Sequence, residues 1–259
     1  MGKITVVGSY IVALVMDTDR IPIEGETVIG HNYHVTHGGK GSNMSAAAAR
    51  LGAESSFVGK IGHDHFGEGF LELLKKEGVD GGGVLYSEKF STAVGIIISS
   101  SKGSNIIVID PGACGDFLPT DVRQNRRFIE ASDVILSPLE IPLETALEGA
   151  CIASAAGVKA ILNPAPATNL RNCDLQCLYA LTPNENEARV CLGLEPDDSI
   201  SDKDAAEQLF DLGIENVIIT LGEKGVLWKS SNGLIEVPAL EVEVLDLSLI
   251  HISEPRDRS

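Results

Sequence analysis

The second half of the chain alternates short apolar runs with longer helical stretches, and this alternation constrains the fold more than any other sequence feature. Apolar runs at 133–136, 158–162 and 217–221 are separated by stretches of helical pattern at 143–156 and 202–212. Strands joined by helices form right-handed crossovers, so they pair into a mostly parallel sheet that is covered on both faces. The sequence therefore predicts an α/β fold.

The first half of the chain contains strands of two kinds. The run 4–8 is apolar and ends in glycine, which is typical of a strand buried on both faces. A strand at 57–62 and a helix at 66–77 continue that pattern. In contrast, 26–36 is rich in β-branched residues but polar, so we expect it at a sheet edge or on a flap. A hairpin is predicted within 92–109.

The charge balance argues against two classes of partner. The chain carries 20 basic and 37 acidic residues, which gives a formal net charge of −17. Such a surface repels phosphate backbones and anionic lipids, so we expect neither nucleic acid nor a membrane as a partner. The apolar runs also fall short of the roughly 18 residues that a membrane span needs. The negative net charge does not exclude a small anionic ligand, because backbone N–H groups in a local pocket can outweigh the electrostatic field of the whole protein.

Two further features predict a cytoplasmic protein. The apolar stretch 1–16 is interrupted by Gly8-Ser9-Tyr10 and lacks a small-x-small cleavage site before Asp17, so we interpret it as a first buried strand and not as a signal peptide. The five cysteines are scattered and odd in number. This usage is typical of reduced thiols in a reducing compartment.

In parallel sheets the ligand lies at the carboxyl ends of the strands, and a glycine-rich loop there is the first candidate. In Gly38-Gly39-Lys40-Gly41-Ser42-Asn43, the glycines allow a close backbone approach, and the helix that follows offers unpaired N–H groups. Lys40 adds a cation and Asn43 an amide, which suit hydroxyls or phosphate. An ordinary glycine turn before a helix is the alternative. Glu140 lies at the same predicted edge, although an exposed glutamate there is usually only solvated.

Two later loops are also candidates. Asn184 and Glu187 are three residues apart on one helical face, where an amide and a carboxylate can hold hydrated magnesium. The alternative, which is common, is a capping interaction in which Glu187 reaches back to the backbone. The segment 220–225 carries two glycines between strands, and a phosphate-binding nest and a plain hairpin turn explain it equally well.

Seven short motifs occur in the order in which they occur in one family of enzymes. They are Gly8-Ser9, Pro22-Ile23-Glu24-Gly25-Glu26-Thr27, Gly38-Gly39-Lys40-Gly41-Ser42-Asn43, the segment 62–68, Leu162-Asn163-Pro164-Ala165-Pro166-Ala167, Thr182-Pro183-Asn184-Glu185 and the segment 220–225. On these motifs the chain resembles the ribokinase-like sugar kinases, the phosphofructokinase-B group, over residues 4–246.

The resemblance implies a three-layer αβα sandwich with a mostly parallel central sheet and a small β-sheet lid, built from strands at about 10–36 and 92–109. It implies transfer of the ATP γ-phosphoryl group to a primary sugar hydroxyl with Mg²⁺, a monovalent cation such as K⁺ as a further cofactor, and a homodimer formed through the lid. It assigns Gly39, Lys40, Gly41, Asn43 and Glu140 to the sugar, Asn184, Thr220, Gly222, Lys224 and Gly225 to the nucleotide, and Glu187 to the metal.

The chain departs from the family pattern at two places. The family usually carries an asparagine and an aspartate on the sugar side just after Gly-Ser, where this chain has Ile11 and Ala13. The loss of two hydrogen-bonding partners argues against ribose as the substrate.

The second departure follows Asp246, where the family continues with Thr-x-Gly-Ala-Gly-Asp. The aspartate of that segment is the catalytic base, and its glycine N–H groups form an anion hole. Residues 247–259 contain no glycine, and neither Asp246 nor Asp257 stands in the position of the base. We therefore expect a family domain at 1–246, an artefactual tail at 247–259 in place of the catalytic segment, no catalytic residue in this chain, and little or no phosphorylation.

Two functions of different class stay open on the sequence. The first is an ATP-dependent kinase of ribose or a related pentose, hexose, keto-sugar or nucleoside, cut short in this chain. The second is a catalytically dead nucleotide- or sugar-binding protein of the same fold, which the retained loop 38–43 favours weakly.

Overall fold

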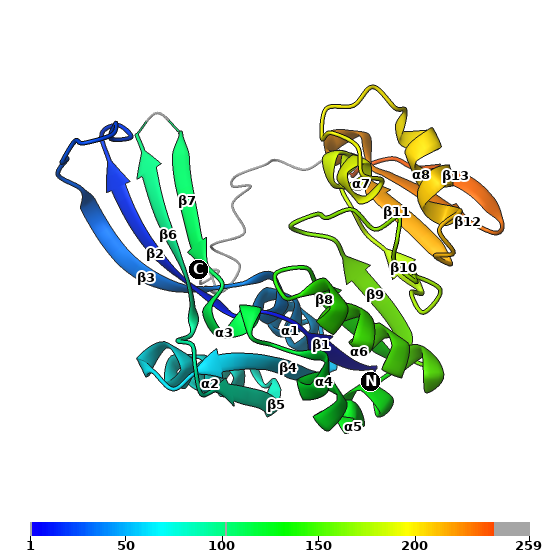
Figure 1. Cartoon of the computed structure of the whole chain (residues 1–259), viewed down its shortest axis with the longest axis horizontal. Coiled ribbons are helices and arrows are strands. Elements are labelled where there is room, and N and C mark those ends of the chain that lie inside the picture. The colour runs from blue at the N-terminus through cyan, green and yellow to red at the C-terminus, as the bar shows by residue number, and fades with distance from the viewer. Residues whose placement is uncertain (1, 102, 241–259) are drawn as a thin grey trace.

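The computed structural model describes residues 2–101 and 103–240, and within these residues the strands form two sheets (Figure 1). The large sheet has nine strands in the order β13-β12-β11-β10-β9-β8-β1-β4-β5, and the small sheet has four in the order β3-β2-β6-β7. Asp246, Asp257 and the tail 247–259 lie outside the described residues.

The bounds of the elements are as follows. The large sheet contains β1 (Lys3–Val7), β4 (Glu54–Gly62), β5 (Asp80–Ser87), β8 (Val134–Pro138), β9 (Lys159–Asn163), β10 (Ala180–Leu181), β11 (Asn216–Thr220), β12 (Val226–Ser230) and β13 (Gly233–Val237). The small sheet, called the lid below, contains β2 (Ile11–Thr18), β3 (His31–Gly38), β6 (Ala93–Ser100) and β7 (Asn105–Asp110). The helices are α1 (Lys40–Arg50), α2 (His65–Glu77), α3 (Gly112–Gly115), α4 (Pro119–Gln124), α5 (Arg126–Glu130), α6 (Leu143–Ala155), α7 (Glu185–Cys191) and α8 (Asp202–Phe210), with a 3₁₀ turn, η1 (Gly222–Lys224).

The central sheet is mostly parallel, as the alternation of strands and helices predicts. Strands β5, β4, β1, β8, β9, β10 and β11 pair in parallel, and β12 and β13 continue the sheet as an antiparallel hairpin. The hairpin follows from the turn at 221–225, which is too short for the crossover that a parallel pair requires.

Helices cover both faces of the sheet. Successive residues of a strand point to opposite faces, so two neighbouring apolar residues are both buried only where each face is covered. Val6 packs in a cluster with Phe57 and with Phe70 of α2, whereas its neighbour Val7 packs in a cluster with Ala150 of α6. Both valines are fully buried. The predicted α/β sandwich with a small β-sheet lid is therefore confirmed.

The apolar stretch 1–16 is not one strand, in contrast to the sequence-based interpretation. It is divided between β1 of the large sheet and β2 of the lid. The break lies at Gly8, where a Cβ would lie 2.9 Å from Cδ of Pro138 and 3.0 Å from Cα of Gly41. The chain leaves the large sheet at this point because the first turn of α1 lies against it.

The segment 112–130, which shows no clear pattern in the sequence, forms the short helices α3, α4 and α5. Strand β5 also went unpredicted, because its first residues read Asp80-Gly81-Gly82-Gly83. Among the described residues, no helix is long and apolar enough to cross a lipid bilayer.

Candidate active site

A cavity of about 570 Å³ lies between the lid and the carboxyl ends of β8 and β9. This is the edge of a parallel sheet at which ligands bind. The cavity is lined by residues from the lid, the loop after it, α1, the loops after β8 and β9, and α7. These residues are Ile11, Lys40, Ile109, Pro111, Gly115, Leu139, Glu140, Ile141, Pro142, Ala165, Pro166 and Glu187.

The glycines of the segment 38–43 are required by the packing of the chain on itself. Helix α1 begins at Lys40, inside the segment that the sequence predicts as a loop before the helix, so Lys40, Gly41 and Asn43 are helical. Gly39 has a φ of +93°, and a Cβ there would lie 2.8 Å from the backbone N of Ile11. A Cβ at Gly41 would lie 2.4 Å from the backbone N of Ser9. The close approach is therefore to the turn at 8–11 of the protein itself.

Glu140 occupies the N-terminus of α1. Its Oε2 accepts hydrogen bonds from Ser9 Oγ at 2.5 Å and from the backbone N of Lys40 at 2.6 Å. Ser9 Oγ in turn accepts from the backbone N of Gly41 at 3.2 Å. A carboxylate is favourable at this position because the helix dipole places partial positive charge there. The second oxygen, Oε1, has no partner within the described part of the chain, and the residue lines the cavity.

Lys40 contributes the positive charge of the cavity. Its ammonium forms no ion pair and no hydrogen bond with any residue that the structure describes, whereas its backbone holds Glu140. Glu187 lines the same cavity from α7. Side chains 147 positions apart in sequence are thus brought to one site by the crossovers of the sheet.

Asn184 and Glu187 form a capping box at the start of α7. The backbone N of Glu187 donates to Asn184 Oδ1 at 2.8 Å, and the backbone N of Asn184 donates to Glu187 Oε2 at 2.8 Å. The capping alternative is therefore present in the structure, and it leaves Glu187 Oε1 without a hydrogen-bond partner among the described residues. The described residues contain no group of three or more His, Cys, Asp or Glu side chains placed to hold a metal ion. A magnesium ion at Glu187 would need its other ligands from water and phosphate, which is the usual arrangement for this ion.

The segment 220–225 lies beside α7. Thr220 forms a parallel bridge with Asn184, and its backbone N donates to the carbonyl of Pro183 at 2.9 Å. The turn has positive φ at Gly222 (+55°) and at Gly225 (+102°), and it joins β11 to β12 as a hairpin. Both sequence-based explanations of this segment, the hairpin and the nest, are compatible with this geometry.

Eight of the eleven candidate residues are not among those that line the cavity of Lys40, and Lys224 and Asn43 illustrate this. Lys224 lines a separate cavity of about 310 Å³ and lies 3.7 Å from Glu185 Oε1. Asn43 lies one turn further along α1 and is not among the residues that line the larger cavity. Lys40, Glu140 and Glu187 are the sequence-predicted residues whose side chains share one cavity.

The comparisons with known proteins decide the family. The pattern described as pfkB family carbohydrate kinase matches residues 1–247. The chain belongs to this family of ribokinase-like carbohydrate kinases.

The relatives of this pfkB family member are similar in sequence and in structure. Ribokinase from Haemophilus influenzae is 39% identical over 223 residues, which cover 86% of this chain and 73% of the relative. The crystal structure of ribokinase from Thermotoga maritima matches with a TM-score of 0.85 at 29% identity and covers 99% of this chain and 88% of its own. Ribokinase from Arabidopsis thaliana, solved in complex with ribose and ATP, matches with a TM-score of 0.85 at 25% identity and covers 97% of this chain and 83% of its own.

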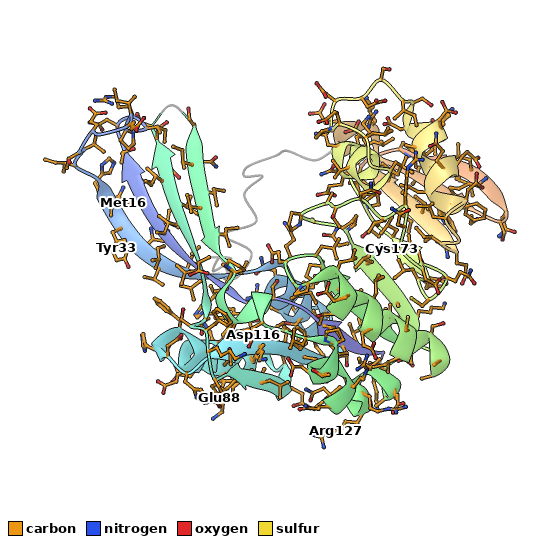
Figure 2. The ribbon with its side chains drawn as sticks, in the orientation of Figure 1. Met16, Tyr33, Glu88, Asp116, Arg127 and Cys173 are labelled. Carbon is orange, nitrogen blue, oxygen red and sulfur yellow. The ribbon has the colours of Figure 1, made fainter. Side chains whose placement is uncertain are left out.

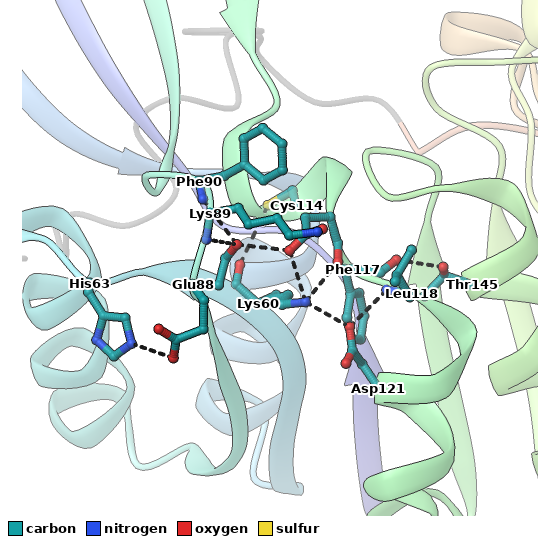
Figure 3. A network of polar contacts seen from close by, with 12 residues as sticks. Lys60, His63, Glu88, Lys89, Phe90, Cys114, Phe117, Leu118, Asp121 and Thr145 are labelled. Atoms are coloured by element: carbon teal, nitrogen blue, oxygen red, sulfur yellow. Dashed lines mark hydrogen bonds and ion pairs between the residues drawn. The ribbon is translucent and has the colours of Figure 1, made fainter.

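A polar network that the sequence did not indicate positions part of the kinase cavity (Figure 3). Lys60 Nζ lies 3.1 Å from Asp116 Oδ2 and 3.0 Å from Asp121 Oδ2, and it donates to the carbonyl of Asp116 at 2.9 Å. Burial lowers the pKa of Lys60, but its hydrogen bonds to the two carboxylates outweigh that effect and raise the pKa above its ordinary value. The network fixes the segment after β7, which contributes Pro111 and Gly115 to the cavity. No local pattern predicts it, because Lys60 lies 56 and 61 positions before the two aspartates.

Proposed function

We propose that this family member is an ATP-dependent kinase that transfers the γ-phosphoryl group to a primary hydroxyl of a small sugar or nucleoside. The observation that carries the proposal is the convergence of Lys40, Glu140 and Glu187 on one cavity between the lid and the sheet. The complex of the Arabidopsis relative with ribose and ATP supports this pair of ligands. Phosphoryl transfer needs positioning and charge stabilisation more than covalent chemistry, and charged side chains around a cavity supply both.

The residues have distinct roles in this proposal. Glu140 Oε1 accepts a hydrogen bond from a substrate hydroxyl, while Oε2 holds α1 in place. The ammonium of Lys40 attracts the transferred phosphoryl group. Gly39, Gly41 and Asn43 complete the substrate side, and Asn184, Thr220, Gly222, Lys224 and Gly225 the nucleotide side. Mg²⁺, held at Glu187 through water, would neutralise phosphate charge, and a monovalent cation such as K⁺ belongs to the same proposal.

The sequence after Asp246 bears on the activity of this 259-residue chain. Residues 247–259 do not contain the Thr-x-Gly-Ala-Gly-Asp segment. In the family that the chain resembles, this segment supplies the catalytic base and the anion hole. We therefore propose that this polypeptide binds its ligands but turns over slowly. The basis is the sequence alone, because these positions lie outside the described residues.

A comparison of two proteins tests the function. ADP release is measured with ATP and a panel of sugars and nucleosides, first for this chain and then for a chimera in which residues after 246 are replaced by the corresponding segment of the Haemophilus relative. We expect turnover from the chimera and very little from the chain itself. Rapid turnover by the unmodified chain contradicts the proposed role of the segment. A silent chimera that still binds an ATP analogue in calorimetry supports the catalytically dead binding protein instead.

A further inference from the structure

We propose that Arg189 is a positioning residue for nucleotide binding, because it fixes the first turn of α7 and with it the carboxylate of Glu187. This role rests on the proposed function, in which Glu187 holds Mg²⁺ through water beside the phosphates. It adds a residue that is not among those lining the cavity and that lies outside the motifs of the sequence. Arg189 acts through another side chain and not on the ligand.

Helix α7 needs contacts with its neighbours to keep its place. It spans seven residues, and isolated helices shorter than about 12 residues are marginal in water. Its capping box fixes Asn184 and Glu187 relative to each other, but not relative to the rest of the protein. The bridge from Asn184 to Thr220 holds the residue before the helix. The position of Glu187 therefore depends on what holds the first turn itself.

The guanidinium of Arg189 ties the first turn of α7 to the start of α8, the helix beside it (Figure 1). Its Nη1 donates to the carbonyl of Glu185 at 2.6 Å, in the first turn of α7. Its Nε donates to the carbonyl of Asp198 and its Nη2 to the carbonyl of Ile200, both at 2.9 Å, in the loop that leads to α8. Nη2 also donates to Asp202 Oδ1 at 3.0 Å, where α8 begins. One side chain therefore joins three segments of the chain.

Burial makes this connection stiff. The Arg189 side chain is 14% exposed and the Asp202 side chain is 26% exposed. Water and salt screen such a pair less than they screen one on the open surface. The guanidinium is planar, so its donors point in fixed directions and hold the carbonyls of α7 and of the loop at set positions. Lysine keeps the charge but carries a compact ammonium on a flexible stem, which cannot replace this fork of donors.

The same turn of α7 also contacts the candidate nucleotide segment 220–225. Lys224 Nζ lies 3.7 Å from Glu185 Oε1, and the carbonyl of Glu185 is the one that Arg189 binds. If the turn loosens, Glu187 and the partner of Lys224 both lose their fixed positions. Groups that orient a metal-binding carboxylate change metal affinity by about 10- to 100-fold, so loss of the Arg189 contacts should weaken the Mg²⁺-dependent part of nucleotide binding.

Arg171 provides a matched control at the other end of the same helix. Its Nε donates to the carbonyl of Leu192, the residue that ends α7, and its Nη2 donates to Gln208 Oε1 on α8 at 3.1 Å. Arg171 therefore also ties α7 to α8, but at the end remote from Glu187. Its replacement should lower the stability of the protein without changing how Mg²⁺ affects nucleotide binding.

Equilibrium binding tests this role without any need for turnover. Calorimetry with the 259-residue chain measures the Kd of a non-hydrolysable ATP analogue with and without Mg²⁺, and the ratio of the two values is compared between variants. Arg189→Met and the milder Arg189→Lys should each reduce the gain from Mg²⁺ by about 10-fold or more. Arg171→Met should keep the ratio of the parent chain. A folded Arg189→Lys protein with the parental ratio overturns the inference, and so does an equal loss in Arg171→Met.

Amide hydrogen exchange tests the positioning itself in the ligand-free chain. Arg189→Lys should speed exchange at the backbone N–H groups of Glu187 and Ala188, which are hydrogen-bonded in the first turn of α7. Arg171→Met should instead speed exchange at Leu192, at the other end. Unchanged exchange of the first turn in Arg189→Lys overturns the inference.

The parent chain separates this inference from the proposed function. A parent that binds the ATP analogue more tightly with Mg²⁺, while the Arg189 variants do so equally well, overturns the role of Arg189 alone. A parent that does not bind the analogue, or that binds it equally well without Mg²⁺, contradicts the proposed metal and nucleotide site, and the role of Arg189 in nucleotide binding is rejected with it.

Discussion

Gly41 and Gly69 both lie in helices, but only Gly69 has room for the methyl group of an alanine. Alanine normally stabilises a helix interior by about 1 kcal/mol relative to glycine. A Cβ at Gly69 meets only His37 Cε1 at 3.9 Å, whereas a Cβ at Gly41 would lie 2.4 Å from the backbone of Ser9. We expect Gly69→Ala to raise the free energy of unfolding by a few tenths to about 1 kcal/mol, and Gly41→Ala to lower it by about 1–3 kcal/mol or more. Urea unfolding measures both, and the same sign for the two variants would contradict the packing described here.

Glu140 combines a structural with a functional contact, and its removal should show both. Loss of its carboxylate leaves Ser9 Oγ and the backbone N of Lys40 without their acceptor. Hydrogen bonds to a charged group contribute about 1.5–3 kcal/mol each at most, so Glu140→Ala should lower the free energy of unfolding by about 2 kcal/mol and weaken alcohol binding. Glu215→Ala, at an exposed site, is the matched control and should change neither. A Glu140→Ala protein that is as stable as that control would contradict the structural role of the carboxylate.

The candidate residues of the site were predictable to different degrees. Lys40, Glu140 and Glu187 were proposed because they follow strands or begin helices at the expected edge of the sheet, and the structure brings them to one cavity. The actual start of α1 was not predicted, because its glycines reduce helix propensity and are tolerated only through contact with Ser9. The bond between Ser9 and Glu140 spans 131 positions, and no local pattern reports such a contact.

At the scale of elements, Asp64 joins α2 to the lid. Its carboxylate caps the helix at the backbone N of Gly67 (2.9 Å) and also accepts from the backbone N (2.7 Å) and Oγ1 (2.8 Å) of Thr92, just before β6. Burial raises the pKa of Asp64, but these hydrogen bonds outweigh it and lower the pKa below its ordinary value. The carboxylate therefore stabilises the fold at pH values above the unfolded pKa of about 4, and this contribution is lost as the pH falls through the lower folded pKa.

This linkage predicts a pH-dependent difference. Asp64→Asn should lower the free energy of unfolding by about 1–3 kcal/mol at pH 7, because the amide replaces one acceptor oxygen by a donor. The difference from the parent protein should shrink as the pH falls below about 4. Denaturant unfolding between pH 7 and pH 3 measures it, with Asp197→Asn at an exposed position as the control. A difference that stays constant over this range would show that the charge of Asp64 plays no part.

Elements with strong apolar periodicity were predicted, and elements built by tertiary contact were not. Strand β8 and helix α6 match the expected ranges within two residues. Strand β5 was not predicted, because glycine is a poor strand former. Its Gly83 sits where a Cβ would lie 2.7 Å from the carbonyl of Phe57, so a residue that suggests a turn serves close strand packing instead. Lys60 contacts Asp116 at the end of α3 and Asp121 in α4, and no local sequence window contains these contacts.

At the scale of the whole molecule, the lid exposes an apolar face that a highly acidic protein would not be expected to leave in water. Met16 and Tyr33 lie on it (Figure 2), and the register places Ile96 opposite both Leu14 and Val108. Ile96 is 50% exposed and Val108 is 62% exposed. Contiguous exposed apolar residues mark an interaction surface, and a second copy of the same chain presents the same face. We therefore propose that the protein forms a homodimer through the lid.

Light scattering during size-exclusion chromatography tests the dimer over a range of protein concentrations. The parent chain should elute with twice the monomer mass, and the double variant Ile96→Glu with Val108→Glu should elute as a monomer, because four carboxylates cannot be buried across the two-fold axis without partners. The control is Leu51→Glu, which also places a charge at an exposed apolar position. Because Leu51 lies at the C-terminal end of α1 and outside the lid, this variant should remain dimeric. A monomeric parent at every concentration would contradict the proposal, and so would a double variant that is folded and still dimeric. Since the net charge of −17 opposes association of two copies, added salt should strengthen the dimer if apolar contact drives it.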